Sequence, residues 1–321
     1  MQFSVVTPLW QDRPPGENLA IAQLADRLGF EALWIGEMAT YDAFAFATAA
    51  ALKTERIQLT IGPLAVAVRT PMTIAMGVAS VADLGGRQTH VALGASSLVV
   101  VEDWHGREHA HSATRLGETA QILRTLTTGG KAEFSGKQAT CRGYRLRLAA
   151  PEPSITIAAF APGAVRVAAQ TADRMLLNMV TPSSLAGLRQ QLSRAAQQCH
   201  RSIPDVAVWL PCALDPEPET IDQLKRAVVG YLAAPGYGEM MIEAGFAELV
   251  NYARTRPHPR DLLAAMPDAL IAAIGLVGDK AFIEQRIAEY AAAGADEICL
   301  VPATAGDPLG ERSLNVIPGL H

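Results

Sequence analysis

Residues 55–97 read ERIQLTIGPLAVAVRTPMTIAMGVASVADLGGRQTHVALGASS, and this stretch decides the fold. Ile57 to Ile61 alternates apolar and polar residues as a strand does, and Gly62-Pro63 interrupts the alternation at the expected carboxyl end of that strand. Apolar residues from Met72 to Leu84 follow helical spacing, two glycines close that helix, and Val91 to Leu93 begins a second strand. The stretch is therefore predicted to form a strand–helix–strand unit, whose small residues at the strand ends let a ligand approach the backbone.

The same alternation of strand and helix recurs along the whole chain. Eight short apolar segments are separated by helical patterns and lie near residues 3, 32, 57, 90, 155, 175, 208 and 298. Eight such units predict a (β/α)8 TIM barrel, an α/β fold, formed by one domain over residues 1–321. An open, doubly wound parallel sheet is the alternative. It is disfavoured because no GxGxxG motif opens a helix after any of the strands.

Two connections are too long for a simple barrel. After the fourth strand we expect a polar loop over residues 102–111 and then an excursion of short strands over residues 131–148. After the seventh strand, residues 215–266 are mostly helical but are interrupted by Pro235-Gly236 and by two further prolines. Insertions are therefore predicted after strands 4 and 7, the second one a helical segment of the kind that forms a lid.

Composition narrows the class of protein. The chain has 321 residues, half of them hydrophobic, and its formal net charge is −5 with no basic run, which argues against a nucleic-acid partner. No apolar run reaches membrane-spanning length, and the first residues lack the pattern of a signal peptide. The four cysteines are scattered without CxxC spacing, so neither a zinc site nor a disulfide framework is indicated. We expect a cytoplasmic protein.

Several motifs, taken in order, make the chain similar to the bacterial luciferase-like superfamily. No single motif is diagnostic, but their order and spacing match over nearly the whole length. The matching segments are Leu24 to Trp34 followed by Glu37, Thr54 to Ile57, Arg69 to Pro71, Gly85 to Arg87, Leu93 to Ala95, Ala158 to Pro162, Ala172-Asp173 and Ala292 to Glu297.

The resemblance implies a TIM barrel that binds a flavin-type cofactor at its carboxyl face. The pattern is most similar to the branch that uses the deazaflavin coenzyme F420, with FMN as the alternative. The implied partner is a small organic substrate, and a homodimer through the helices that flank the early strands is expected.

The resemblance also implies which residues contact the cofactor. Gly62-Pro63 matches a cis peptide that forms a bulge behind the ring, where the plain interpretation is a trans proline ending a strand. Phe160 to Ala164 resembles a phosphate-binding turn, because free N–H groups at a helix start suit an anion; the plain interpretation is an ordinary strand-to-helix turn. The predicted cofactor-binding residues are Gly62, Pro63, Ala95, Ser96, Ser97, Phe160, Ala161, Pro162, Gly163, Ala164 and Asn178.

Glu37, at the end of a buried strand, is the candidate catalytic residue. As a general acid or base it would contact substrate or cofactor; as a rim carboxylate it would cap a helix or pair with a cation, and the two interpretations have equal weight. Many F420-dependent relatives have His after this acid, where this chain has Met38. Some also have Glu near Ser97, and that acid is missing. These departures argue against an alcohol-oxidising mechanism.

The remaining polar candidates are histidines. His105, His109 and His111 share one loop, but their spacing matches no zinc pattern, so we expect a surface loop with one His facing substrate and no metal. His90 lies in a strand and is interpreted as a hydrogen-bonded barrel residue.

Three functions remain open. The first is an oxidoreductase that transfers a hydride between coenzyme F420 and a small organic substrate, in the reducing direction. The second is an FMN-dependent luciferase-like monooxygenase that uses reduced flavin and oxygen. The third is a barrel that binds a flavin without turnover.

Overall fold

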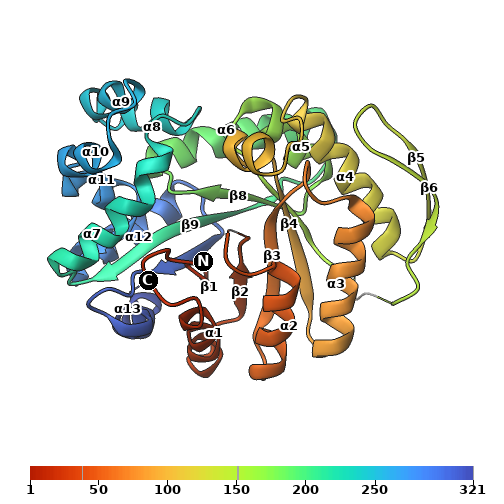
Figure 1. The fold of residues 1–321 in the computed structure, drawn as a ribbon, viewed down its shortest axis with the longest axis horizontal. Helices are drawn as coiled ribbons and strands as arrows, with labels where there is room; N and C mark the ends of the chain where they lie inside the picture. Colours follow the sequence, from red (N-terminus) through yellow and green to blue (C-terminus); the bar gives the residue numbers. More distant parts are fainter. Residues whose placement is uncertain (38, 150–151, 321) are drawn as a thin grey trace.

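Eight parallel strands close into a barrel in the computed structural model, which describes residues 1–37, 39–149 and 152–320 (Figure 1). The strands are β1 (Gln2–Val6), β2 (Ala32–Ile35), β3 (Gln58–Ala65), β4 (Thr89–Gly94), β7 (Ile155–Ala158), β8 (Arg174–Asn178), β9 (Asp205–Leu214) and β11 (Glu297–Pro302). Each pairs with the next in this order, and β11 pairs with β1 to close the ring. All eight predicted strands are present, so the TIM-barrel prediction is confirmed.

Helices surround the barrel, and their starts follow local sequence rules. The Asp42 side chain accepts hydrogen bonds from the N–H groups of Phe44 and Ala45, and Thr70, Thr181 and Asp279 cap later helices in the same way. The main surrounding helices are α1 (Glu17–Arg27), α2 (Ala43–Lys53), α3 (Pro71–Gly85), α4 (Ser112–Thr127), α5 (Pro162–Thr171), α6 (Pro182–Gln198), α7 (Pro218–Val228) and α12 (Lys280–Ala292).

Strand residues alternate between two hydrophobic clusters. Outward residues such as Leu59 and Ile61 pack against the helices in the larger cluster. Inward residues form a separate cluster inside the barrel, made of Val6, Trp34, Ala92, Leu176, Ala207 and Cys299. Because successive side chains in a strand point to opposite faces, these two clusters identify which residues face the barrel interior.

The amino end of the barrel is filled by a polar network. Glu297 Oε1 accepts hydrogen bonds from Ser4 Oγ at 2.6 Å and from Trp34 Nε1 at 3.0 Å, and Arg174 pairs with Glu297 Oε2 at 2.8 Å. His90 Nδ1 accepts from the Ser154 N–H at 3.0 Å, which confirms it as a hydrogen-bonded barrel residue. Since this end is filled, a ligand site is left to the opposite, carboxyl end.

One prediction about β3 is wrong. The strand does not end at Gly62-Pro63 but continues to Ala65, with a bulge between Ile61 and Leu64. Gly62 has φ of +120°, and a methyl group added there would lie 2.1 Å from the Ala92 carbonyl oxygen. The interruption that was interpreted as a strand end is a bulge, after which the pairing with β4 resumes one step out of register.

The connection after β4 is more helical than expected. A π-helix, η1 (Val99–Trp104), occupies the start of the predicted polar loop, which therefore begins only after Trp104. The predicted excursion of short strands is an antiparallel hairpin of β5 (Lys131–Ser135) and β6 (Thr140–Arg145), which lies at the outer edge of the molecule in Figure 1.

The connection after β9 is helical, as predicted. Short helices follow α7 and gather on one side of the barrel in Figure 1. They are η2 (Val229–Tyr231), α8 (Tyr237–Glu243), α9 (Ala247–Arg254), α10 (Pro259–Ala265) and α11 (Asp268–Ala273), followed by β10 (Leu276–Gly278). Among the described residues, no helix combines the length and apolar character needed to cross a membrane. The chain ends with η3 (Pro308–Gly310), α13 (Glu311–Val316) and η4 (Ile317–Gly319).

Candidate active site

Small residues line one half of the barrel mouth. On four consecutive strands the inward position nearest the carboxyl end has no side chain or a single methyl group; these positions are Gly36, Gly62, Gly94 and Ala158. A methyl group added at Gly94 would lie 3.0 Å from Pro63 Cβ and 3.8 Å from Ala158 Cβ, so these positions are close neighbours. We call this set the small-residue layer. Few side-chain atoms separate the backbone from the mouth there, although the Trp209 ring lies 3.6 Å from a methyl group added at Gly36.

Larger side chains occupy the other half of the mouth. Asn178 of β8 and Trp209 of β9 are paired in register and both point inward, as does Val301 of β11. The Trp209 ring packs edge-to-face on Trp34 beneath it, with centroids 5.8 Å apart. Its Nε1 is buried and has no hydrogen-bond partner among the described residues. An unpaired buried N–H is costly, so an acceptor atom of a ligand at this position would be stabilising.

The Gly62-Pro63 bond is cis, as predicted. The bond lies in the small-residue layer, and the Pro63 ring lies over Gly94. The predicted backing for a cofactor ring therefore borders the part of the mouth that is free of large side chains.

The loop after β4 is held from two sides. Ser96 adopts a left-handed conformation with φ of +62°, and its carbonyl lies 3.1 Å from His109 Nε2. The Ser97 hydroxyl accepts a hydrogen bond from the Val100 N–H at 3.3 Å, at the start of η1. Of the three loop histidines, His109 is the one that folds back onto the predicted cofactor loop. Within the described ranges, no group of three or more His, Cys, Asp or Glu side chains is arranged to hold a metal ion.

The predicted phosphate turn begins a helix whose first turn has no capping side chain. Ala161 is extended, Pro162 is the first residue of α5, and no side chain caps the start. The first N–H groups of a helix have no intrahelical partner, so those of Gly163 and Ala164 suit an anion. A methyl group added at Gly163 would lie 3.4 Å from Ala113 Cβ, which places the starts of α5 and α4 side by side.

Two tyrosines of the insertion complete the mouth, and the sequence did not identify them. Tyr231 and Tyr237 both hydrogen-bond the Asn178 side chain, and their rings pack at 4.9 Å. Burial raises the pKa of both phenols, and the Asn178 hydrogen bond opposes this shift. Tyr237 also packs on Phe160 at 4.9 Å. The sequence offered only the Pro235-Gly236 break just before Tyr237; in the structure Gly236 has φ of +86°, and a methyl group there would lie 2.7 Å from the Phe160 ring.

Glu37 lies on the rim and is already partnered. Its two oxygens pair with the Arg69 guanidinium, with Nε to Oε2 at 2.9 Å, and Oε1 also accepts from the Ala43 N–H at 3.2 Å. Arg69 also pairs with Asp42, and these carboxylates raise the pKa of Arg69. The contacts of Glu37 are those of a helix-capping, ion-paired carboxylate. Met38, the next residue, lies outside the described residues.

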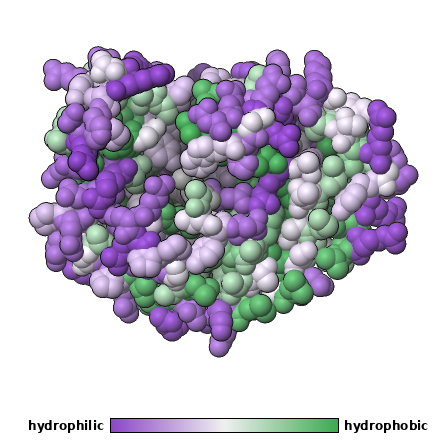
Figure 2. Space-filling model, in the orientation of Figure 1, coloured by the Kyte–Doolittle hydropathy of each residue, from purple (hydrophilic) through white to green (hydrophobic). Residues whose placement is uncertain are grey.

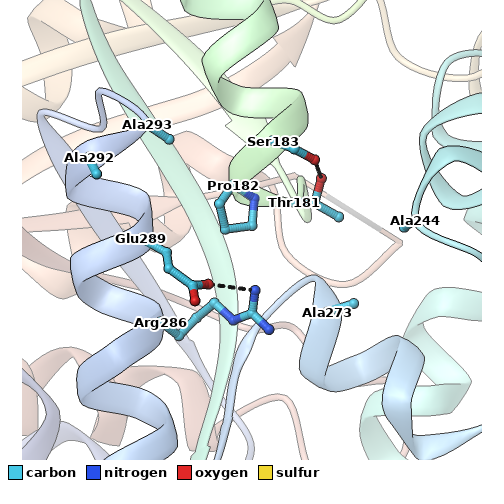
Figure 3. Close-up of a pocket in the computed structure, with 9 residues that line it drawn as sticks. All are labelled: Thr181, Pro182, Ser183, Ala244, Ala273, Arg286, Glu289, Ala292 and Ala293. Atoms are coloured by element: carbon cyan, nitrogen blue, oxygen red, sulfur yellow. Dashed lines mark hydrogen bonds and ion pairs between the residues drawn. The ribbon is translucent and has the colours of Figure 1, made fainter.

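Two cavities lie outside the mouth. One, of about 560 Å³, is lined by the start of α6, by Ala244 and Ala273, and by the face of α12 that carries the Arg286–Glu289 pair (Figure 3). The other, of about 360 Å³, lies between the β3–α3 loop, the start of α4 and the β5–β6 hairpin. The second cavity is lined by the loop that follows β3, the strand that carries Gly62-Pro63.

Comparisons with known proteins agree with this geometry. The model of the luciferase-like monooxygenase family matches residues 1–297. A 5,10-methylenetetrahydromethanopterin reductase from Archaeoglobus fulgidus is 22% identical over 309 residues, 92% of this chain and 91% of that protein. The coenzyme F420-dependent tetrahydromethanopterin reductase of Methanopyrus kandleri has the same fold, with a TM-score of 0.83, 20% identity and full coverage of both chains.

A monooxygenase has a related fold. The oxygenating constituent of 3,6-diketocamphane monooxygenase from Pseudomonas putida, solved with FMN, has a TM-score of 0.69 and 17% identity, covering 99% of this chain and 96% of that one. The barrel is thus shared by proteins described with F420 and with FMN.

Proposed function

This chain belongs to the luciferase-like monooxygenase family, and from that membership and the site geometry we propose that it is an oxidoreductase that transfers a hydride between coenzyme F420 and a small organic substrate. Relatives that match over nearly their whole length include 5,10-methylenetetrahydromethanopterin reductases, and one reductase of known structure is named for its dependence on F420. We propose the reducing direction for this chain as well.

The small-residue layer is the observation that carries the proposal. A deazaflavin ring would lie close to the strand backbone along one half of the mouth. The residues at this position have no side chain or only a methyl group; they are Gly36, Gly62, Gly94 and Ala158. When bound, the cofactor supplies the two-electron hydride chemistry. The chain would bind and orient it: Gly62-Pro63 behind the ring, Ala95, Ser96 and Ser97 along one edge, the α5 start at the phosphate, and Asn178 with Trp209 on the far side.

The proton donors at the mouth support the reducing direction. Reduction of a C=C or C=N bond requires a proton as well as a hydride. Tyr231 and Tyr237 hold their protons at neutral pH, because the ordinary pKa of a phenol is about 10 and burial raises the pKa of both further. If Asn178 donates its amide hydrogens to the phenol oxygens, each O–H is left to point to substrate. By contrast, Glu37 is engaged by Arg69, and the His and Glu of alcohol-oxidising relatives are absent from the sequence.

A pair of binding titrations tests the cofactor assignment. The purified protein is titrated with F420 and with FMN, and binding is followed by cofactor fluorescence. We expect F420 to bind more tightly. Oxidation of reduced F420 is then followed by absorbance with a panel of imines and activated alkenes that includes methylenetetrahydromethanopterin. Tight FMN binding together with no F420 binding would refute the proposal.

The FMN-dependent monooxygenase is the second candidate, favoured by the FMN complex of the related fold. Oxygen uptake with reduced FMN separates it from the first, because reduced deazaflavin activates oxygen poorly. A barrel that binds F420 tightly but oxidises none of the panel would instead support binding without turnover.

We also propose a homodimer through α2 and α3. Three large apolar side chains on these helices are strongly exposed: Leu52 (65%), Met76 (49%) and Leu84 (64%). Figure 2 shows apolar surface along the lower edge of the molecule, where Figure 1 places α2 and α3. Sedimentation of the wild-type protein and of the Leu84→Glu variant tests the interface: we expect a dimer for the first and a monomer for the second.

A further inference from the structure

The cavity of about 360 Å³ lies outside the barrel mouth. Its walls are the β3–α3 loop, the first turn of α3, residues 107–108, α4 as far as Thr119 and the hairpin residues 138–140. None of the described residues that line it belongs to the small-residue layer or to the turn at the start of α5. A ligand held in this cavity would therefore be separate from the proposed cofactor.

The walls of the cavity are held in place by their own contacts. The Glu118 carboxylate accepts hydrogen bonds of 2.7 Å from three successive N–H groups of the hairpin, those of residues 137–139. Arg69 in the β3–α3 loop is fixed by its ion pairs with Glu37 and Asp42. Because these elements are already ordered, a ligand that enters the cavity has a lower entropic cost of binding.

Two of the arginines that line this cavity have no carboxylate partner among the described residues. Arg115 donates to the Glu108 carbonyl at 2.7 Å and to Gln138 Oε1 at 2.9 Å, which are neutral acceptors and use only part of its fork of N–H donors. The Arg107 guanidinium makes no ion pair with any described residue. Glu108 is the one acidic residue among those that line the cavity. In a chain whose formal net charge is −5, this local excess of positive charge favours an anionic ligand.

A buried hydroxyl and a helix start add uncharged donors. Thr119 lines the cavity one turn after Arg115, is 1% exposed, and its Oγ1 has no hydrogen-bond partner among the described residues. An unpaired buried hydroxyl is costly, so an acceptor atom of a ligand would stabilise it. Met72 also lines the cavity, and its N–H is one of the first-turn groups of α3 that have no intrahelical acceptor. These donors are all of the kind that an oxyanion accepts from.

The rest of the lining is largely apolar. Side chains without polar atoms that could bind an anion are contributed by Val66, Ala67, Val68, Pro71 and Ala139. A bare inorganic ion would leave this part of the wall without contacts. The cavity volume of about 360 Å³ is also that of a small-molecule site, which is typically about 300–1,000 Å³. The lining therefore suits a charged group attached to a hydrocarbon body.

We propose that this cavity is a second ligand site, which binds a small organic anion with one carboxylate or phosphate group on an apolar body. The oxyanion would accept hydrogen bonds from Arg107, Arg115 and Thr119, and the apolar body would pack on Val66 and Met72. The site is separate from the barrel mouth, so this assignment does not depend on the function proposed above.

Isothermal titration calorimetry of the full chain at fixed ionic strength tests the proposal with three probes. Benzoate and phenyl phosphate carry the two charged groups on the same apolar ring, and benzamide is the neutral control with the shape of benzoate. We expect at least one of the two anions to bind, and benzamide to bind at least about tenfold more weakly than that anion. Whichever anion binds more tightly identifies the charged group that the site prefers.

Variants of the cavity walls then locate the bound anion. Combined replacement of Arg107→Gln and Arg115→Gln should weaken its binding about tenfold. Thr119→Val should weaken it about fivefold without lowering the melting temperature of the free protein, because the hydroxyl has no partner to lose. Glu108→Gln should strengthen binding about threefold, because it removes the like charge from the wall. The control Gln138→Ala removes a partner of Arg115 but keeps both cations, and should leave the affinity unchanged.

Three results would overturn the proposal. If neither anion binds the wild-type protein, or if benzamide binds as tightly as the anions, the cavity does not recognise an organic oxyanion. If an anion binds but its affinity is unchanged in the double arginine variant and in Thr119→Val, it binds elsewhere on the chain. If Gln138→Ala weakens binding as much as the double variant does, Arg115 only positions the hairpin and does not hold the ligand.

Discussion

Replacing Glu37 with Gln separates the two interpretations of this carboxylate. Glu37 pairs with Arg69 through both oxygens, and the two side chains are 22% and 20% exposed. The amide introduced by Glu37→Gln keeps one carbonyl acceptor for the Ala43 N–H but loses the ion pair. Partial exposure screens that pair, so we expect a loss of about 1 kcal/mol of unfolding free energy. For a chain of this size that corresponds to a melting temperature lower by about 2 °C.

The expected kinetic effect is small. If Glu37 is a rim carboxylate, the rate of reduced F420 oxidation with the best substrate of the panel should change less than about threefold. Loss of a general acid or base would instead slow the reaction roughly 100- to 10,000-fold. The matched control is Asp42→Asn, which removes the other carboxylate from Arg69 and is 49% exposed.

Calorimetry and stopped-flow absorbance measure the two quantities on the same samples. A Glu37→Gln protein with a nearly unchanged melting temperature, unchanged F420 affinity and a rate at least roughly 100-fold lower would refute the structural interpretation. In that case Glu37 would act on substrate in spite of its contacts with Arg69.

Three further predictions test other parts of the barrel. Tyr237→Phe should slow hydride transfer roughly 100-fold while F420 affinity stays unchanged, and the exposed Tyr252→Phe control should have no effect. Because burial raises the pKa of Tyr237, the wild-type rate should show no loss from phenol ionisation below about pH 10. Equal rates for Tyr237→Phe and wild type would exclude Tyr237 as the proton donor. Gly62→Ala should lower the free energy of unfolding by about 4 kcal/mol in urea titrations, since the added methyl group meets the Ala92 carbonyl oxygen. The control is Gly86→Ala, where φ is positive but nothing lies within 4 Å, and it should lower the free energy of unfolding by only about 1–2 kcal/mol. Similar losses for both variants would contradict the steric argument. Burial lowers the pKa of His90 in the folded state, so the unfolded chain binds a proton at this imidazole more readily. The stability contributed by this group should therefore be present above about pH 6.5 and fall as the pH drops below it. In urea titrations at successive pH values, His90→Gln should flatten the fall in unfolding free energy below that pH, and an unchanged slope would assign the pH dependence to other groups.

The barrel was predictable from the sequence because its rules are local. Each barrel strand is a short apolar run, and six of the eight main helices begin at prolines or at Asp and Thr caps that can be read directly; α1 and α4 do not. Gly62-Pro63 was also recognised, through the resemblance to a family. Its effect on β3 was misjudged, because a bulge that lets a strand resume looks the same in sequence as a strand end.

The tyrosines of the mouth were not predictable in the same way. Tyr231 and Tyr237 reach Asn178 from more than 50 residues away in sequence, and no periodicity in the insertion indicates which of its faces packs on the barrel. Glu37 shows the converse case. Its position at a strand end suggested chemistry, but its role depends on Arg69, whose side chain returns from the next β/α connection.

The two halves of the mouth come from different parts of the chain, and under the proposed function this would separate the cofactor from the substrate. The small-residue layer is formed by β2, β3, β4 and β7, which all precede residue 159. Asn178, Trp209 and the two tyrosines follow it, and the tyrosines belong to the helical insertion. A change in the insertion therefore alters what faces the ring without touching the residues behind it. Substitutions at Tyr231 and Tyr237 should change which substrate is reduced while F420 affinity is maintained, whereas substitutions in the layer should remove both together.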